Sequence, residues 1–184
     1  TFGQKKAIEK GYIVGPRIAL AANINGDNGQ GKIANTAEEG RIMVRIAKAE
    51  GYDFIKVYSK LNIETYNAIV DEAHKQGLKT IGHIPNAFEG KLEQAFVPHF
   101  GMVAHAEEFS KHSENFSIED AQKFAKLSKD NGTYLSPTLT TMVWIAKQTH
   151  SIDHIKNLPA LKYVHPLLQS KWLTANNYVK NASP

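Results

Sequence analysis

The sequence contains no cysteine among its 184 residues. This absence excludes structural disulfides, zinc sites built from thiolates and a cysteine nucleophile. The eight histidines are therefore the candidate metal ligands, because neutral imidazole is a common ligand of zinc and similar divalent ions.

Long apolar runs and dense blocks of charge are also missing. No apolar segment approaches the roughly 20 residues that a membrane-spanning helix needs, so we expect no membrane partner. The formal net charge is only +4, and lysines such as Lys123, Lys126 and Lys129 are spread along a helix-like segment. A nucleic-acid partner is therefore disfavoured, since it would require clustered basic residues.

The first residues, Thr1-Phe2-Gly3, include neither an initiator methionine nor the apolar core of a signal peptide. We expect any targeting segment to lie outside this sequence. The sequence itself therefore gives no localisation.

Short apolar runs rich in β-branched residues alternate with amphipathic segments. This pattern is typical of an α/β fold with a parallel sheet. A composition of 42% hydrophobic and 22% charged residues is that of one globular domain, which we predict over residues 1–184. Periodicity alone leaves open whether the sheet is doubly wound or part of a (β/α)8 barrel. Five strands are predicted, at Arg17–Ala22, Tyr52–Tyr58, Leu78–Ile84, Gly101–Ala106 and Thr133–Leu139.

The helices between these strands carry start signals. Thr36 with Glu39, and Ser117 with Asp120, have the spacing of a capping box, and Asn62 is a candidate N-cap. Helix ends are marked by Gly51, Gly77 and Gly132, each of which follows a helical run and precedes a strand.

Two segments depart from the alternation. Residues Asn23 to Lys32 form a long polar loop with several glycines, which is either a lid or a surface loop. After Leu139 we predict helical segments interrupted by Pro159 and Pro166 and no further strand. This last part carries aromatic residues at Trp144, Tyr163, Trp172 and Tyr178.

Ligand-type residues stand at or near the ends of three successive predicted strands: Lys56, His83 and His105. Adjacent parallel strands bring their carboxyl-terminal side chains to one edge of the sheet, where (β/α) barrels have their active sites. Strand alternation places Lys56 on the face opposite Ile55 and Val57. The sequence therefore predicts that the three residues lie together.

The chemistry of these residues suits a metal centre. Two imidazoles supply nitrogen ligands, whereas a lysine must first lose its proton, which burial beside cations favours. The free amine of Lys56 could then add carbon dioxide and give a carbamate, whose two oxygens can bridge two metal ions. Each residue also has a structural explanation, because single histidines near strand ends are usually hydrogen-bonded and strand-end lysines commonly extend to solvent.

Six short motifs follow one another between about Gly11 and Leu139. They are Gly15-Pro16-Arg17, Asp53-Phe54-Ile55-Lys56-Val57, Glu72-Ala73-His74-Lys75-Gln76-Gly77, Gly82-His83, His105-Ala106-Glu107-Glu108 and Ser136-Pro137-Thr138-Leu139. In this order and spacing they resemble the amidohydrolase superfamily, and most closely its imidazolonepropionase-like and prolidase-like branch.

The resemblance implies that the chain supplies about strands three to seven of an eight-stranded TIM-like (β/α) barrel. It makes Lys56 the strand-four lysine that is carboxylated in many members, and His83 and His105 the ligands on strands five and six. His74 is expected to be structural. Tyr58 could bind a substrate carbonyl or fill the barrel, while Glu107 and Glu108 could orient a ligand or be solvated loop charges.

Two elements of that superfamily are missing from the sequence. No His-x-His pair occurs, and no Gly-Thr-Asp run, which supplies the aspartate general base, follows Leu139. We therefore expect the chain to be a central piece of the barrel, with the general base outside it and no activity of its own.

The function expected from the resemblance is metal-dependent hydrolysis of a carbon–nitrogen bond in a small amide or dipeptide-like substrate. The expected cofactor is a divalent metal, zinc by preference, with one or two ions in the complete enzyme. The alternative is a non-catalytic barrel fragment or scaffold without metal. A phosphate-binding barrel is disfavoured, because Ser136-Pro137-Thr138-Leu139 lacks the glycines of an anion-binding loop. An incomplete barrel has unpaired edges, so pairing between copies of the chain is also expected.

Overall fold

The computed structural model describes residues 1–27, 29–113, 115 and 117–175, so the predicted aromatic residue Tyr178 lies outside the described residues. The chain separates into two compact units, Thr1–Pro137 and Thr138–Pro184. The single barrel domain expected over residues 1–184 stays a prediction. Within the described residues no helix combines the length and the apolar character that crossing a membrane requires.

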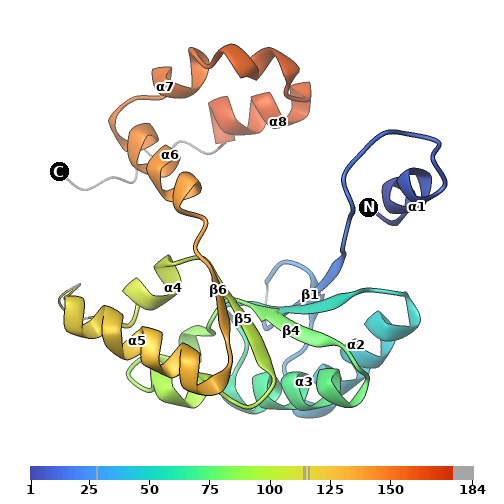
Figure 1. Ribbon diagram of the computed structural model, residues 1–184, viewed down its shortest axis with the longest axis vertical. Coiled ribbons are helices and arrows are strands. Elements are labelled where there is room, and N and C mark those ends of the chain that lie inside the picture. Colours follow the sequence, from blue (N-terminus) through green and yellow to red (C-terminus); the bar gives the residue numbers. More distant parts are fainter. Residues whose placement is uncertain (28, 114, 116, 176–184) are drawn as a thin grey trace. The chain divides into compact units, whose positions relative to one another are not determined.

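The first unit is built on a six-stranded sheet in which every neighbouring pair is parallel, in the order β2-β1-β3-β4-β5-β6 (Figure 1). An α/β fold with a parallel sheet is thus confirmed. The strands are β1 (Ala21–Asn25), β2 (Lys32–Ile33), β3 (Phe54–Val57), β4 (Lys79–Gly82), β5 (Phe100–Ala104) and β6 (Tyr134–Ser136).

The long helices that connect these strands gather along one face of the sheet (Figure 1). The longest are the crossover helices α2 (Ala37–Ala49), α3 (Ile63–Lys75) and α5 (Ile118–Asn131). Shorter elements are α1 (Phe2–Glu9), α4 (Glu107–Ser110) and the 3-10 turns η1 (Asn86–Phe88) and η2 (Leu92–Ala95).

The predicted helix boundaries are confirmed. The Thr36 side chain accepts a hydrogen bond from the Glu39 N–H while the Glu39 carboxylate returns to the Thr36 N–H, which is a complete capping box at the start of α2. Asn62 and Ser117 cap α3 and α5 through their side-chain oxygens. The glycines Gly51, Gly77 and Gly132 follow the helices with positive φ and turn the chain into the next strand.

The two faces of the sheet differ in burial. On β3, Ile55 and Val57 are fully buried beneath the helices, while Phe54 and Lys56 on the other face stay half-buried. A cavity of about 640 Å³ lies over that second face, at the amino ends of the strands. Its sheet-facing wall includes Phe54, Ile81, Met102 and Tyr134. The described part of the first unit therefore has one helix-covered face and one hollow, largely apolar face.

The number and limits of the strands differ from the sequence prediction. The first strand covers Ala21–Asn25 instead of Arg17–Ala22, and β2 lies within the segment that was predicted to be loop. The asparagines of β1 misled the prediction, because asparagine is rare in strands. Asn25 is nonetheless buried, since its side-chain oxygen accepts from the N–H groups of Gly26 and the distant Lys60.

The second unit is helical within its described residues, as predicted. It comprises α6 (Leu139–His150), α7 (Asp153–Lys156), η3 (Pro159–Tyr163), α8 (Pro166–Ser170) and the π-helical turn η4 (Lys171–Ala175). Pro159 and Pro166 stand in the first turns of η3 and α8, where a missing backbone N–H costs no hydrogen bond. Trp144 and Trp172 line a cavity of about 400 Å³ inside this unit.

Candidate metal centre

The three predicted ligand residues occupy the carboxyl ends of three adjacent strands. Lys56 is the penultimate residue of strand β3, His83 directly follows β4, and His105 directly follows β5. The pairs β3–β4 and β4–β5 are parallel neighbours in the sheet. The shared edge that the sequence predicted is therefore present.

The side chains form a continuous run at this edge. The ring centroids of Tyr58 and His83 are 4.0 Å apart, and those of His83 and His105 are 4.8 Å apart. The Lys56 Nζ atom lies 5.1 Å from the centroid of the Tyr58 ring. The structure thus brings together the four residues for which the sequence suggested a role in metal or substrate binding.

Unusual backbone conformations set the positions of both histidines. Gly82 has φ +133°, and a Cβ atom there would lie 2.2 Å from the Val57 carbonyl oxygen. The close approach lets the His83 N–H donate to that same carbonyl at 3.0 Å. His105 itself has φ +77°, a conformation that costs a non-glycine residue about 1–2 kcal/mol and recurs at functional sites. Its N–H donates to the Ser136 carbonyl on β6 at 2.8 Å.

His83 is buried and electrically neutral near neutral pH. Its exposed fraction is 5%. Burial lowers the pKa of His83 to about 4, and the nearby charges of Lys56, His105 and Lys111 act in the same direction. Its Nδ1 atom is buried and has no hydrogen-bond partner among the described residues. A buried polar nitrogen without a partner is costly unless something binds it.

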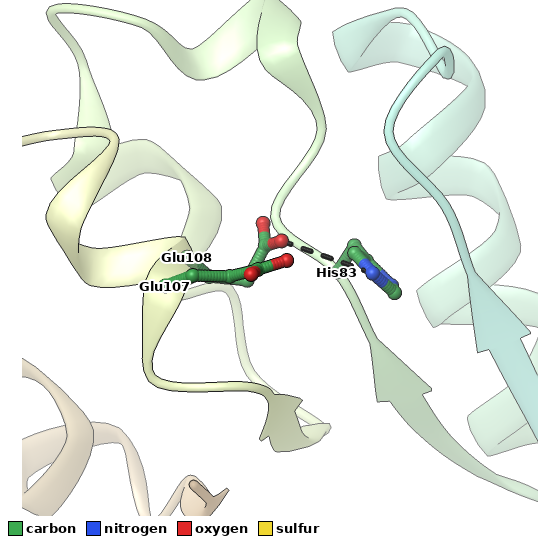
Figure 2. Close-up of side chains that lie close together, drawn as sticks. All are labelled: His83, Glu107 and Glu108. Atoms are coloured by element: carbon green, nitrogen blue, oxygen red, sulfur yellow. Dashed lines mark ion pairs between the residues drawn. The ribbon is translucent and has the colours of Figure 1, made fainter. Parts of the chain in front are cut away.

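Two carboxylates of α4 complete the cluster. One ligand atom each from His83, Glu107 and Glu108 lie within 4.8 Å of one another, a spacing at which a metal ion could be held among them. Figure 2 shows both glutamate side chains extending from α4 toward the imidazole of His83. A buried His/Glu/Glu group that could hold a metal ion is therefore part of this edge.

The contact between His83 and Glu108 is not a salt bridge of two full charges. Their nearest atoms, His83 Nε2 and Glu108 Oε1, are 3.8 Å apart, which is within ion-pair range only if the histidine is protonated. Because the pKa of His83 is lowered to about 4, we take the imidazole as neutral. The Glu108 carboxylate then interacts with the dipole of a neutral ring, and one nitrogen of that ring keeps a lone pair that can bind a metal ion.

The donor set fits a divalent transition metal. Neutral imidazole and carboxylate oxygen are suitable ligands for zinc and similar ions, and the Nδ1 atom of His83 has no hydrogen-bond partner among the described residues. Lys56, by contrast, has its Nζ over the Tyr58 ring, an arrangement typical of an ammonium group. Its predicted role as a ligand stays a prediction, as does its carboxylation.

Sequence reasoning missed part of this edge. Glu108 is fully buried, so the interpretation as a solvated loop charge is wrong for that residue. Asn23, assigned to a loop, lies beside Lys56 in the β1–β3 register. Its Oδ1 is buried without a hydrogen-bond partner among the described residues. The signal that was available is a polar side chain at the end of an apolar strand, the same signal that identified Lys56.

His74 lies away from this cluster, on the exposed side of α3. Its ring stacks on that of His99 at a centroid distance of 3.5 Å. This arrangement agrees with the structural role expected for His74.

Comparison with known proteins gives similarity in fold. No family model matches the chain, and no curated protein matches it. A bottromycin amidohydrolase superposes with a TM-score of 0.69 at 21% identity, over 98% of this chain. A Xaa-Pro dipeptidase crystallised with methionine in its active site superposes with a TM-score of 0.57 at 18% identity, over 82% of this chain. An uncharacterized protein superposes with a TM-score of 0.51 at 19% identity, over 97% of this chain.

This chain spans less than half of each solved structure, namely 42%, 42% and 46% of their lengths. At these identities the likeness shows the fold alone. It is a fold that an amidohydrolase and a dipeptidase share with this chain.

Proposed function

We propose that this chain is the central part of a metal-dependent hydrolase that cleaves a carbon–nitrogen bond in a small amide or dipeptide-like substrate. Two solved proteins with a similar fold are a bottromycin amidohydrolase and a Xaa-Pro dipeptidase. Since the chain spans 42% of each, the activity is proposed for the larger protein of which this chain would be a part.

The proposed architecture is an eight-stranded (β/α) barrel, with β1, β3, β4, β5 and β6 as its strands three to seven. Helices on one face of a parallel sheet and a hollow on the other support this arrangement, because a barrel has its helices outside and its side chains packed inside. Three additional strands would close the barrel over that hollow.

The observation that carries the proposal is the state of His83. It is a buried, neutral imidazole with an unpartnered nitrogen, placed where three strand ends and two carboxylates meet. A histidine with only a structural role would normally satisfy that nitrogen with a hydrogen bond.

Within the centre we assign His83, His105 and Lys56, the last as its carbamate, to hold the cation, with Glu107 as a further oxygen ligand. A divalent ion bound there would lower the pKa of a bound water and polarise an amide carbonyl. Tyr58, whose ring packs on His83, can donate its hydroxyl to a substrate carbonyl and so orient the scissile bond. We assign no general base within this chain.

Metal content tests the proposal. The chain and its His83→Ala and His105→Ala variants are loaded with zinc and bicarbonate, desalted, and measured by plasma mass spectrometry. His154→Ala is the matched control, because His154 is exposed and lies in the second unit. We expect stoichiometric zinc in the chain and the control, and its loss in both test variants.

Two other outcomes contradict the proposal. Zinc that persists in His83→Ala and His105→Ala would rule out these ligands. Absence of zinc from all four samples would contradict a metal centre formed by this chain and would favour the non-catalytic scaffold.

A further inference from the structure

Glu108 is a buried carboxylate at the base of the candidate centre. It lies in the first turn of α4, three residues after His105, and has an exposed fraction of 0%. An ionised carboxylate in such a position requires compensating partners. The identity of those partners indicates what the residue does.

One partner ties Glu108 to the segment that carries His83. The Ile84 N–H, in the peptide directly after His83, donates to Glu108 Oε2 at 3.0 Å. A second partner is Lys111, one turn later in the chain, whose Nζ donates to Oε1 at 2.7 Å. Glu108 thus joins the end of strand β4 to the segment after β5, which carries His105.

Both carboxylate oxygens of Glu108 accept hydrogen bonds within the protein. Glu107 differs from Glu108 in this respect. No hydrogen bond or ion pair joins the half-buried Glu107 carboxylate to another described residue. Glu107 is therefore free to serve as a direct ligand, while Glu108 already serves as an acceptor within the protein.

The remaining contact of Glu108 is with the imidazole of His83. Glu108 Oε1 lies 3.8 Å from Nε2 of that ring. A buried negative charge favours the tautomer whose N–H points toward it. With the proton on Nε2, the lone pair remains on Nδ1, which is the nitrogen that has no partner.

We propose that Glu108 is a positioning residue that fixes His83 in the Nε2–H tautomer and anchors its backbone, so that the Nδ1 lone pair faces the cation. This inference rests on the proposed metal-dependent function only for the identity of what Nδ1 binds. Carboxylates that orient metal-binding histidines in this way commonly contribute 10- to 100-fold to metal affinity, as an order of magnitude.

The tautomer of the metal-free chain is the first test. Histidine labelled with ¹⁵N is observed through two-bond ¹H–¹⁵N correlations at mildly alkaline pH, where His83 is neutral. His83→Asn identifies the signals by their disappearance. We expect a protonated Nε2 and an unprotonated Nδ1. A protonated Nδ1 would overturn the proposal without any Glu108 variant.

The second test uses Glu108→Gln, which keeps the shape of the side chain and removes its charge. We expect the His83 signals to shift toward the other tautomer or a mixture of the two. Zinc affinity, measured by competition with a chelator, should fall by about 10–100-fold. The matched control is Glu119→Gln on the exposed surface of α5, which should change neither quantity.

The two readouts separate this inference from the proposed function. A shifted tautomer in a folded Glu108→Gln chain supports the positioning role even if zinc binds to neither protein, in which case only the proposed function fails. An unchanged tautomer with circular dichroism like that of the parent chain would overturn the positioning role, whatever the zinc affinity.

Discussion

Gly82 shows how a single missing side chain positions the candidate centre. A Cβ atom on it would lie 2.2 Å from the Val57 carbonyl oxygen and 2.9 Å from the Val57 nitrogen. Backbone atoms of a central strand cannot move aside cheaply. Gly82 is therefore required for the close contact between β3 and β4 immediately before His83.

Gly82→Ala should destabilise the first unit by about 2 kcal/mol or more, because it combines an unfavourable φ with a backbone collision. Gly90→Ala is the control, since Gly90 also has positive φ but no atom within 4 Å of the position that a Cβ atom would take, and it should cost about 1 kcal/mol. Urea denaturation followed by circular dichroism measures both. Equal losses in the two variants would show that the collision at Gly82 is relieved.

The positions of the residues at the candidate centre were only partly predictable. The common edge of Lys56, His83 and His105 could be found from the sequence because each lies at or just after the end of an apolar strand, at a spacing of about one βα unit. The burial of Glu108 could not, because it depends on the Ile84 N–H, 24 residues earlier in the chain. Local sequence around Glu108 shows only two adjacent acidic residues in a loop.

Among the elements, α2 and α3 are joined by an ion pair that depends on pH. Arg45 on α2 donates through Nε to the buried Glu72 on α3 at 2.9 Å, and Gln76 donates to the same carboxylate at 2.8 Å. The hydrogen bond from Arg45 lowers the pKa of Glu72 below its ordinary value, although burial opposes this shift.

A carboxyl group whose pKa is lower in the folded chain stabilises the fold above its ordinary pKa, and this contribution is lost as the pH falls below that value. We expect urea midpoints to decline below about pH 4.5, the ordinary pKa of a glutamate. Glu72→Gln should lower stability by about 1–3 kcal/mol at neutral pH and reduce the decline in acid.

Glu64→Gln, at an exposed position in the first turn of the same helix, serves as the control and should keep the decline. An acid response of Glu72→Gln as steep as that of the parent chain would show that other carboxylates dominate.

The elements were more predictable where the signals are local. Helix starts and ends depend on nearby residues, so they can be predicted from the local sequence. The examples are the N-caps at Thr36, Asn62 and Ser117 and the glycines with positive φ that follow the helices. Strand β2 was missed because its pairing with β1 depends on the path of the intervening loop. The Asn23 Nδ2 group donates to the Gln30 carbonyl within that loop. Strand propensities of single residues contain no information on such a contact.

At the scale of the whole molecule, the sheet of the first unit ends in strands that pair on one side only. Strand β6 is hydrogen-bonded to β5 and to no other strand among the described residues. Its Tyr134 is 77% exposed. An open edge with exposed apolar side chains invites pairing with another chain.

We therefore expect concentration-dependent association in sedimentation velocity, and Tyr134→Lys should reduce it by placing a charge on the edge strand. Ile118→Lys is the matched control, because Ile118 is similarly exposed, at 73%, but lies on helix α5. A monodisperse monomer at all concentrations would contradict the expectation, and equal effects of the two variants would assign association to general hydrophobicity.

The fold class was predictable at this scale because alternation of strands and helices reflects chain-wide packing. Whether the sheet closes into a barrel was not predictable, because the hydrophobic periodicity of the strands and helices is the same in an open sheet and in part of a barrel.

The two ends of the strands carry different kinds of residue. The glycines that end α2, α3 and α5 lie before β3, β4 and β6, whereas Lys56, His83 and His105 lie at the opposite ends of their strands. Substitutions at the amino-terminal edge act on helix termination and on the turn into the next strand. Substitutions at the carboxyl-terminal edge act on the candidate centre, except at Gly82, which serves the backbone contact there. In evolutionary terms, side chains around the candidate centre can therefore change while the glycine turns at the other edge, which end the helices, stay the same.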